Sequence, residues 1–511
     1  MTVKGKVRPP QYNNRKLTQK QNNMLRKIRI CLQVVTITLV TLLLLGIGFR
    51  VHLWAGWVAK IQFLPAFLAI NGAVVCFFIV LTIIFGRIYC SVVCPLGIMQ
   101  DFFSWLGGMA KKNRFSYAKG NNWLRYGFLV VFIIALIIGF APLTTLFEPY
   151  SAYSRIVNSL FKPLYDLLNN WLAGIDAAND RYNFTEVQIW TRSVTTFVVA
   201  ILTLLVLAFI AWRKGRLYCN SICPVGSLLS LASLNSMFRV RFDKDKCKNC
   251  GMCEKNCKAQ AIDFKEGKVD YSRCVVCGDC LDKCKFDALH YTAKKPVKKS
   301  KPVDTERRAF LVGAAVAGTT AALAQTEMKV DGGLAVIEDK KAPKRQTPIT
   351  PPGSVSARHM QRHCTACQLC VSSCPNNVLR PSTDLMHFMQ PVMSFERGYC
   401  RPECTRCSEV CPTGAIKPIT REEKTMQHVG HAVWIKENCV ASEKGISCGN
   451  CARHCPTGAI TMVDYESPSG KVQVPAVDEN KCIGCGACEN LCPARPFSAI
   501  YVEGNTMHRI D

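Results

Sequence analysis

Six ordered runs of four cysteines are the feature that most constrains what this chain can fold into. Two runs lie between residues 247 and 284, and four lie between residues 364 and 492. A disulfide framework of thirty cysteines would suit short secreted chains. This chain has 511 residues and long apolar stretches. Runs of the form C-x₂-C-x₂-C-x₃-C instead indicate iron–sulfur clusters.

The first two runs have the spacing of a bacterial two-cluster ferredoxin. Three closely spaced cysteines wrap three irons of a cubane, and the fourth cysteine of each run ligates the other cluster. Structural zinc sites use separated pairs that close on one tetrahedral ion, which argues against zinc here. The two expected [4Fe-4S] ligand sets are Cys247, Cys250, Cys253 with Cys284, and Cys274, Cys277, Cys280 with Cys257.

Lysine follows the fourth cysteine of both runs. Lys258 and Lys285 stand where such ferredoxins usually carry proline. A cation close to a cluster raises its reduction potential, whereas a solvated lysine has little effect.

Four more runs predict four further clusters near the end of the chain. They are Cys364, Cys367, Cys370 and Cys374; Cys400, Cys404, Cys407 and Cys411; Cys439, Cys448, Cys451 and Cys455; and Cys482, Cys485, Cys488 and Cys492. Pro-Thr-Gly-Ala-Ile follows both the second and the third run, as expected for a duplicated ferredoxin half. Regular outer runs around irregular inner runs favour pairing of the first with the fourth and the second with the third. Pairing of neighbouring runs is the alternative.

Four stretches without Asp, Glu, Lys or Arg are long enough to cross a bilayer, namely residues 30–49, 61–85, 126–147 and 193–212. A span needs about 20 apolar residues, and one central charge costs about 2.5–3.5 kcal/mol. We therefore expect four transmembrane helices. A cleaved signal peptide is not expected, because further spans follow the first.

Basic residues orient these spans. Residues 1–29 and the loop between the second and third spans are strongly basic, whereas the stretch between the third and fourth is balanced, so the first two regions should be cytoplasmic. Although a basic arm can bind nucleic acid, this one leads directly into an apolar span, and we expect no nucleic-acid partner. The net charge of +28 falls once clusters bind, because each oxidised cluster with its thiolates carries about two negative charges.

An internal repeat, G-R-x-Y-C-x-x-x-C-P-x-G, follows the second span at residues 86–97 and the fourth span at residues 215–226. Two such copies suggest parallel helix pairs related by an axis along the membrane normal. A C-x₃-C pair would lie along one side of a helical turn. The four cysteines of the repeat could hold one more cluster, form a redox dithiol, or stay unliganded near a quinone: Cys90, Cys94, Cys219 and Cys223.

A second crossing signal lies in the middle of the chain. A basic linker leads to Arg307-Arg308, Phe310-Leu311 and an apolar stretch that ends at Ala324. The pattern is that of a twin-arginine export signal, although Glu306 and Val312 depart from it. A short soluble helix is the alternative, and cleavage after Ala324 stays open. Residues 326–357, rich in Pro, Lys and Thr, are expected to form a flexible linker.

The predicted fold is therefore multi-domain: a four-helix transmembrane bundle of two repeated helix pairs, an α+β two-cluster ferredoxin, one further single crossing, and an α+β four-cluster ferredoxin. The expected boundaries are 1–29 for the basic arm, 30–240 for the transmembrane domain, 241–296 for the first ferredoxin, 297–325 for the linker and export-like segment, 326–357 for the second linker and 358–511 for the second ferredoxin.

The chain resembles a fusion of two known subunits. Residues 1–290, with four spans, two repeat motifs and a two-cluster ferredoxin, resemble the NapH-type membrane subunit of periplasmic nitrate reductase systems. Residues from 305 resemble the exported NapG/MauM-type ferredoxin. The resemblance implies a quinol dehydrogenase of the bacterial inner membrane. Quinol would donate electrons, and the clusters would pass them to a periplasmic cytochrome or reductase subunit, with the first ferredoxin cytoplasmic and the second periplasmic.

The sequence contains no hydride-transfer fingerprint, flavin motif or nucleophile constellation, so the clusters themselves carry the redox chemistry. Whether the chain is itself an enzyme stays open. His52 and Glu148, near the outer ends of the first and third spans, are the candidates for a quinone site, with solvated interfacial residues as the alternative. A maturation or regulatory factor of the NosR or CcoG kind is the rival function, since these share the membrane cysteine motifs. A cytoplasmic cluster array that reduces a soluble acceptor is a third.

Overall fold

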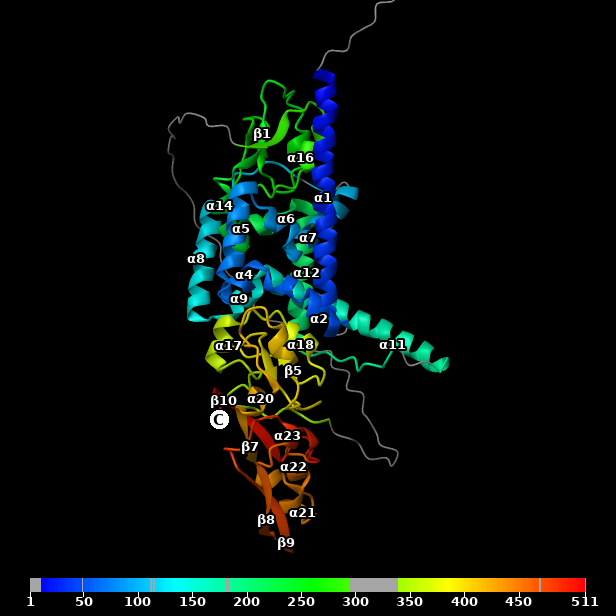
Figure 1. Ribbon diagram of the computed structural model, residues 1–511, viewed down its shortest axis with the longest axis vertical. Helices are drawn as coiled ribbons and strands as arrows, with labels where there is room; N and C mark the ends of the chain where they lie inside the picture. Colours follow the sequence, from blue (N-terminus) through cyan, green and yellow to red (C-terminus); the bar gives the residue numbers. More distant parts are fainter. Residues whose placement is uncertain are drawn as a thin grey trace, which may run out of the picture.

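The computed structural model describes residues 11–47, 49–110, 113, 115–180, 184–293, 339–467 and 470–510. Three parts follow one another along the long axis of the molecule (Figure 1). We call them the helical region (residues 11–233), the middle domain (238–293) and the C-terminal domain (339–510). The middle and C-terminal domains lie at opposite ends of the helical region. The twin-arginine-like segment falls outside the described residues.

The helical region consists of helices of unequal length. They are α1 (Gln11–Leu45), α2 (Phe49–Ala55), α3 (Trp57–Lys60), α4 (Phe63–Leu68), α5 (Gly72–Phe85), α6 (Ile88–Val92), α7 (Pro95–Met109), α8 (Asn122–Ile138), α9 (Ala141–Phe147), α10 (Pro149–Ile156), the π-helix η1 (Val157–Phe161), α11 (Lys162–Ala178), α12 (Val194–Lys214), α13 (Leu217–Ser221) and α14 (Pro224–Ser233). Two are long and apolar enough to cross a membrane, α1 over Met24–Leu45 and α12, whereas α5 and α8 are apolar but shorter.

Two of the four expected spans are interrupted, so the prediction of four continuous helices is wrong at these places. In 61–85 the break lies at Ile70, which has a φ of 57°, and the side chain of Asn71 accepts a hydrogen bond from the Val74 amide to start α5. In 126–147 the break lies at Gly139, with a φ of 86°. A hydropathy profile does not detect such breaks, because they depend on backbone dihedrals and helix capping and not on how apolar the residues are.

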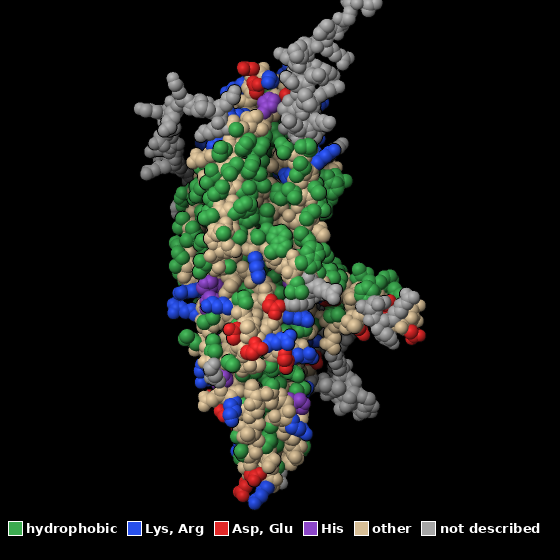
Figure 2. All heavy atoms as spheres, viewed as in Figure 1, with side chains coloured by type: hydrophobic (Ala, Val, Ile, Leu, Met, Phe, Trp, Pro, Cys, Tyr) green, Lys and Arg blue, Asp and Glu red, His purple; other side chains and the backbone are tan. Residues whose placement is uncertain are grey.

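The surface of the helical region is mostly apolar. Figure 2 shows a broad band of hydrophobic side chains across the face in view, with charged side chains gathered beyond its two ends. On α8 and α12 large apolar residues are more than half exposed, among them Val130, Ile137, Leu205 and Phe209. A contiguous apolar surface of this size is unusual for a soluble monomer and marks contact with lipid or protein.

The middle domain is a small α+β unit of short elements. They are β1 (Phe238–Phe242), α15 (Met252–Lys255), β2 (Ile262–Asp263), β3 (Lys268–Val269), α16 (Asp279–Lys283) and β4 (Leu289–Ala293). Strand β1 pairs antiparallel with β4, with Val240 opposite Tyr291, and β2 pairs with β3. The Tyr291 hydroxyl donates to the carbonyl of Phe85, so the domain rests on the end of α5.

The C-terminal domain has the same kind of architecture on a larger scale. Its helices are α17 (Ala357–His363), α18 (Leu369–Ser373), α19 (Arg406–Val410), α20 (Arg421–Thr425), η2 (Lys436–Asn438), α21 (Val440–Lys444), α22 (Asn450–Arg453) and α23 (Ala487–Leu491). Its strands form three antiparallel pairs: β5 (Leu379–Pro381) with β6 (Pro391–Met393), β7 (Gln427–Trp434) with β10 (Ile500–Ile510), and β8 (Ile460–Ser467) with β9 (Gly470–Val477).

The described part of the expected flexible linker, residues 339–357, packs on the C-terminal domain. Lys340 Nζ donates to the carbonyls of Glu489 and Cys492, at 2.7 and 2.9 Å, and the Arg345 guanidinium pairs with the Glu489 carboxylate. Composition alone did not reveal these contacts, because their partners lie about 150 residues further along the chain.

Candidate cluster sites and the helical region between them

The eight run cysteines of the middle domain surround two separate pockets. Cys247, Cys250, Cys253 and Cys284 line one, and Cys257, Cys274, Cys277 and Cys280 line the other. These are the groups that the spacing predicts, with the fourth cysteine of each run placed in the pocket of the other run. Among the described residues, no three Cys, His, Asp or Glu side chains converge as ligands of a single metal ion.

The backbone around these cysteines is shaped to face a large anionic group. Residues within or just after the C-x₂-C segments adopt positive φ, including Asn249 at 52° and Gly251 at 67°. Such turns direct successive amides toward one point, which favours an anion. Amides donate to the fourth cysteines as well: Ala261 N lies 3.3 Å from Cys257 Sγ, and Ala288 N lies 3.3 Å from Cys284 Sγ. Amide donors of this kind tune the potential of an iron–sulfur cluster.

Burial makes the thiols poor acids in the absence of metal. It raises the pKa of Cys253, Cys274 and Cys451 to about 11. Thiolates at these positions therefore need nearby positive charge, which cluster iron supplies. Thiols that are grouped in fours, mostly buried or half-buried, and in part backed by amide donors fit [4Fe-4S] clusters.

The C-terminal domain groups its runs as neighbours, and the preferred pairing of first with fourth and second with third is wrong. Cys374 of the first run joins Cys400, Cys404 and Cys407 of the second around one pocket. In the other half, Cys492 of the fourth run joins Cys439, Cys448 and Cys451 of the third. The remaining fourth cysteines complete the exchange, since Cys411 interacts electrostatically with Cys364, Cys367 and Cys370, and Cys455 with Cys482 and Cys485. The irregular spacings of the inner runs are absorbed by local loops, so they carry no information about pairing.

The two halves of the C-terminal domain meet at these cysteines. The Cys400 amide donates to the carbonyl of Cys485 at 2.9 Å, and the two side chains also interact electrostatically. The four cysteine groups therefore follow one another through the domain without an intervening spacer.

Lys258 is a docking residue and not a solvated one. Its side chain is 9% exposed, and its Nζ lies 3.0 Å from both Asp101 of α7 and Asp279 of α16. Asp101 also pairs with Arg216 at 2.7 Å, and Arg29 of α1 approaches both acids. We call these five residues the ion cluster; it joins the middle domain to the helical region. Lys285 is exposed.

The structure explains why the repeat motif needs its glycines, prolines and arginines. Gly86 and Gly215, both at positive φ, leave room for the middle domain: a Cβ on Gly86 would lie 2.9 Å from Val276, and one on Gly215 would lie 2.4 Å from the Lys258 carbonyl. The prolines Pro95 and Pro224 stand in the first turns of α7 and α14. The chain therefore leaves the short helix at each second cysteine, and a continuous helical turn through C-x₃-C, as expected from spacing, is not formed.

The arginines and final glycines lock the two copies together. Arg87 Nη2 donates to the Cys219 carbonyl at 3.2 Å, and Arg216 Nη1 donates to the Cys90 carbonyl. A Cβ on Gly97 would lie 2.4 Å from the Cys90 carbonyl and 3.2 Å from Arg216. The second copy repeats this arrangement, so the two motifs face each other across a local two-fold relation.

This exchange brings the four repeat cysteines together. Cys90, Cys94, Cys219 and Cys223 are each 4–5% exposed. Cys94 interacts electrostatically with Cys90 and Cys219, and Cys223 interacts with the other three. The thiols lie between the middle domain, which Arg87 contacts through the Ser272 carbonyl at 2.9 Å, and the far end of the helical region.

The two quinone-site candidates both lie where the helical region meets the C-terminal domain. His52 of α2 lies 3.2 Å from the Ser373 hydroxyl, and Glu148 caps α10 by accepting from the Ser151 amide. Glu148 also interacts electrostatically with Cys367.

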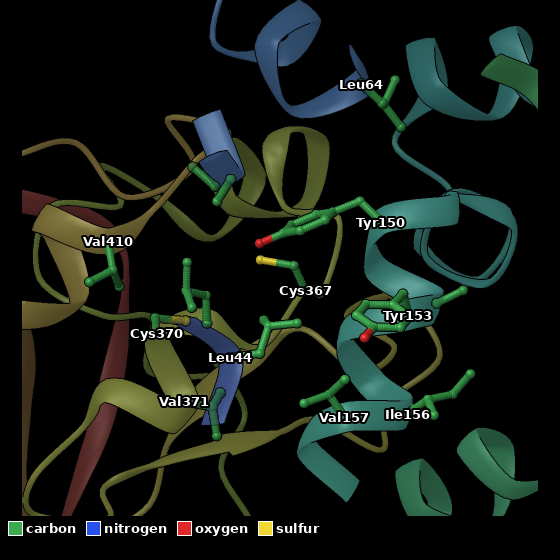
Figure 3. Close-up of a cluster of buried hydrophobic side chains, with 14 of the residues drawn as sticks. Leu44, Leu64, Tyr150, Tyr153, Ile156, Val157, Cys367, Cys370, Val371 and Val410 are labelled. Atoms are coloured by element: carbon green, nitrogen blue, oxygen red, sulfur yellow. The ribbon is translucent and has the colours of Figure 1, made fainter. Parts of the chain in front are cut away.

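Sequence reasoning missed Tyr150, which follows Glu148 and reaches the cluster side of this junction. In Figure 3 the Tyr150 hydroxyl and the Cys367 sulfur point toward each other within an apolar core built from α1, α10 and α18. Tyr150 is 1% exposed and carries no cluster-binding pattern, so only its neighbours in space identify it.

Three protein-family models match the chain. A 4Fe-4S dicluster domain matches residues 363–415 and 444–495, and two 4Fe-4S binding domains match residues 67–114 with 195–244 and residues 239–262. Multiple ferredoxin-type domains are therefore present. Each dicluster match contains cysteines of two neighbouring runs, in agreement with the observed pairing. The matches at 67–114 and 195–244 each contain one copy of the motif, which confirms the internal repeat.

Several ferredoxin-type proteins are similar to part of the chain. The methylamine utilization ferredoxin-type protein MauM of Methylobacillus flagellatus is 31% identical over 155 residues, which cover 29% of this chain and 65% of that protein. MauM of Methylophilus methylotrophus is 32% identical over 156 residues, covering 29% and 68%. The ferredoxin-type protein NapF of Escherichia coli is 30% identical over 91 residues, covering 18% and 52%. The chain thus spans about two thirds of the MauM proteins and half of NapF.

Proposed function

This chain belongs to the family of MauM-type ferredoxins, iron–sulfur proteins of electron transfer, and from that premise we propose that it oxidises quinol in a membrane and delivers the electrons to a periplasmic cytochrome or reductase subunit. In this proposal α1, the α4–α5 and α8–α9 pairs and α12 cross the inner membrane as a four-span bundle. The likeness of residues 1–290 to NapH-type subunits stays a prediction.

The arrangement of the three parts is the observation that carries the proposal. The cysteine groups of the middle domain and those of the C-terminal domain lie at opposite ends of a region with a broad apolar surface (Figures 1 and 2). With the basic loops in the cytoplasm, the middle domain lies on the cytoplasmic side and the C-terminal domain on the periplasmic side.

Six [4Fe-4S] clusters would occupy the six cysteine groups. When bound, they accept and pass on single electrons, and this chain's residues set how easily they do so. Amide donors to the sulfurs favour the reduced, more negative state. The ion cluster holds the middle domain against the helical region and places the Lys258 ammonium near Cys277.

A seventh centre at the four repeat cysteines is supported by charge balance. Arg87 is fully buried, and its closest described acceptors are neutral: Asn220 Oδ1 at 2.7 Å and the carbonyls of Ser272 and Cys219. A buried cation is stable only with compensating charge. Deprotonated cysteines would supply that charge, as they do when they bind a cluster.

Electron paramagnetic resonance of the anaerobically purified full chain tests the function. Addition of menadiol, a reduced menaquinone analogue, should produce reduced-cluster signals. If dithionite produces these signals and menadiol does not, quinol is not the donor, and a maturation role of the NosR or CcoG kind takes precedence.

Topology is tested independently with a cysteine-free epitope placed after residue 511. The epitope should be labelled from outside intact spheroplasts, whereas an epitope inserted in the basic loop near Lys119 should be protected. Protection of both epitopes would refute the periplasmic position of the C-terminal domain.

A further inference from the structure

A cavity of about 670 Å³ lies where the helical region meets the C-terminal domain. One wall is formed by η1 and the start of α11, a second by residues 187–197 up to the first turn of α12, and a third by the C-terminal domain around α18. Its volume falls within the range of sites that hold small molecules, about 300–1,000 Å³. A short π-helix such as η1 is often found at functional sites.

Buried polar groups without partners line this cavity. Thr196 Oγ1, Gln368 Nε2 and both polar atoms of the Asn158 side chain have no hydrogen-bond partner within the part of the chain that the structure describes. Thr196 is 3% exposed and Gln368 is 4% exposed. Buried polar atoms left unpaired destabilise the folded protein, so a ligand with donors and acceptors would recover that loss.

A cluster cysteine forms part of the same wall. Cys374, which shares a pocket with Cys400, Cys404 and Cys407, lines the cavity. Arg192 lines it too and interacts electrostatically with Cys374 and with Asp166. A redox-active ligand in the cavity would thus lie against a predicted cluster site.

The remaining lining is apolar and lies at the edge of the apolar band. Leu164 is 62% exposed and Phe197 is 37% exposed, and α12 begins at Val194. Trp190 secures the wall, because the guanidinium carbons of Arg380 and Arg397 lie 4.6 and 4.9 Å from its ring centroid. The cavity therefore offers polar groups inside and an apolar approach outside, which matches an aromatic ring with two hydroxyls and a hydrocarbon tail.

From these features we infer that the cavity is the site where the hydroquinone ring binds, a position that rests on the proposed function and makes it specific. Asn158 Oδ1 accepts from a ring hydroxyl, and Gln368 Nε2 and the Thr196 hydroxyl donate to the ring oxygens. Conversion of hydroquinone to quinone releases two electrons and two protons. With a cluster held by Cys400, Cys404, Cys407 and Cys374, the electrons would pass to it and on to the downstream acceptor, and the protons would leave to water by way of Asp166, the one carboxylate among the described lining residues.

Binding of the quinol analogue 2-heptyl-4-hydroxyquinoline N-oxide to the purified full chain tests this site, with quenching of its fluorescence as the readout. The double variant Asn158→Leu, Thr196→Val removes three of the four unpaired polar atoms and keeps the number of side-chain heavy atoms at both positions. We expect its dissociation constant to rise at least tenfold. Thr203→Val is the matched control, because it makes the same change on α12 where the hydroxyl already donates to the Val199 carbonyl. It should change the constant less than twofold.

Leu164→Trp is a second test of the site, which does not depend on whether the double variant folds. Leu164 is exposed, so a larger side chain there narrows the cavity without entering the core. It should also weaken binding at least tenfold, while dithionite produces the same cluster signals as in the unaltered chain.

Two results would overturn the site, and they differ in what else they overturn. If the unaltered chain binds the analogue and menadiol reduces its clusters, but the cavity variants bind equally well, the cavity is the wrong place and quinol oxidation stands. If the unaltered chain neither binds the analogue nor is reduced by menadiol, both the site and the proposed function are wrong.

Discussion

Replacement of Lys258 by methionine should loosen the middle domain from the helical region. The Lys258 ammonium is held 3.0 Å from each of two carboxylates, and the side chains of all three residues are less than 20% exposed. Methionine has a similar length and no charge, so the variant removes the central cation and leaves Asp101 and Asp279 facing each other.

The expected loss of docking free energy depends on which cations remain beside each carboxylate. Removal of one partner of a buried pair costs about 3–5 kcal/mol when the remaining charge is uncompensated. Asp101 keeps Arg216 at 2.7 Å, and Asp279 keeps Arg26 at 3.2 Å. We therefore expect a smaller loss of about 2 kcal/mol, which corresponds to a factor of about 30 in the equilibrium for local separation of the domain.

Hydrogen–deuterium exchange of the full chain in detergent micelles measures this equilibrium. Amides of α16 should exchange about 30-fold faster in Lys258→Met, in line with the expected loss of about 2 kcal/mol. Those of β8 and β9, in the C-terminal domain, should not change. Lys285→Met is the matched control, since Lys285 follows the other fourth cysteine of the same ferredoxin and is exposed.

Equal exchange in the two variants would refute the reasoning, because it would mean that the buried ion pairs add nothing to docking. A second readout is the reduction potential of the neighbouring cluster, which should fall when the cation is lost. A unit charge 8–16 Å away at an effective dielectric of about 20 contributes about 1–2 kcal/mol, or roughly 45–90 mV for one electron.

Three further predictions concern the cysteine pairing, the repeat and the ion cluster. Cys374→Ser and Cys404→Ser should each lower the iron content by about four atoms, and so should their double variant, because both cysteines belong to the same cluster site. The double variant Cys374→Ser, Cys485→Ser should lose about eight atoms, because its cysteines belong to two sites. A loss of about eight atoms in the first double variant would instead support the pairing of the first run with the fourth and the second with the third. Gly97→Ala should destabilise the helical region by about 1–3 kcal/mol in thermal unfolding, whereas Gly127→Ala, which meets nothing within 4 Å, should not. The stability with which the middle domain docks on the helical region should be constant between about pH 5 and pH 10. Although burial opposes both shifts, the opposite charges lower the pKa of the Asp279 carboxylate and raise the pKa of the Lys258 ammonium. The stability that Asp279 adds to docking is therefore lost as pH falls through its lowered pKa. The stability that Lys258 adds is lost as pH rises through its raised pKa. Tighter exchange protection of α16 at either extreme would contradict this sign.

The sequence predicted the features that depend on neighbouring residues, such as the cysteine groups of the middle domain. It did not predict the features that depend on backbone turns or on contacts between distant segments. The cysteine groups of the middle domain follow from spacing, because each run forms one loop and the exchange of fourth cysteines is built into the two-run fold. The breaks at Ile70 and Gly139 were missed, since an apolar run has the same hydropathy whether or not its backbone turns. Lys258 could not be recognised as buried, because its partners Asp101 and Asp279 lie in two other elements.

The position of the four repeat cysteines leads to one last prediction. It concerns whether electrons from quinol reach only the C-terminal domain or the middle domain as well. In the proposed site, hydroquinone bound beside Cys374 would reduce the clusters of the C-terminal domain directly. If the helical region spans a membrane as proposed, electrons bound for the middle domain would have to cross an apolar layer about 30 Å thick. Within the described helical region, four thiols that lie close together could act as a relay on that route: Cys90, Cys94, Cys219 and Cys223.

The double variant Cys90→Ser, Cys219→Ser removes one thiol from each motif and keeps the remaining packing. If the thiols relay electrons, menadiol should reduce all clusters of the unaltered chain but only about four of the six in the variant, as measured by spin integration against dithionite. Full reduction of the variant by menadiol would refute the relay, because the middle domain would then receive electrons without the repeat cysteines. Equal partial reduction of both proteins would also refute it: the middle-domain clusters would then be isolated from quinol, and the repeat motif would serve only to dock the two copies through Arg87 and Arg216.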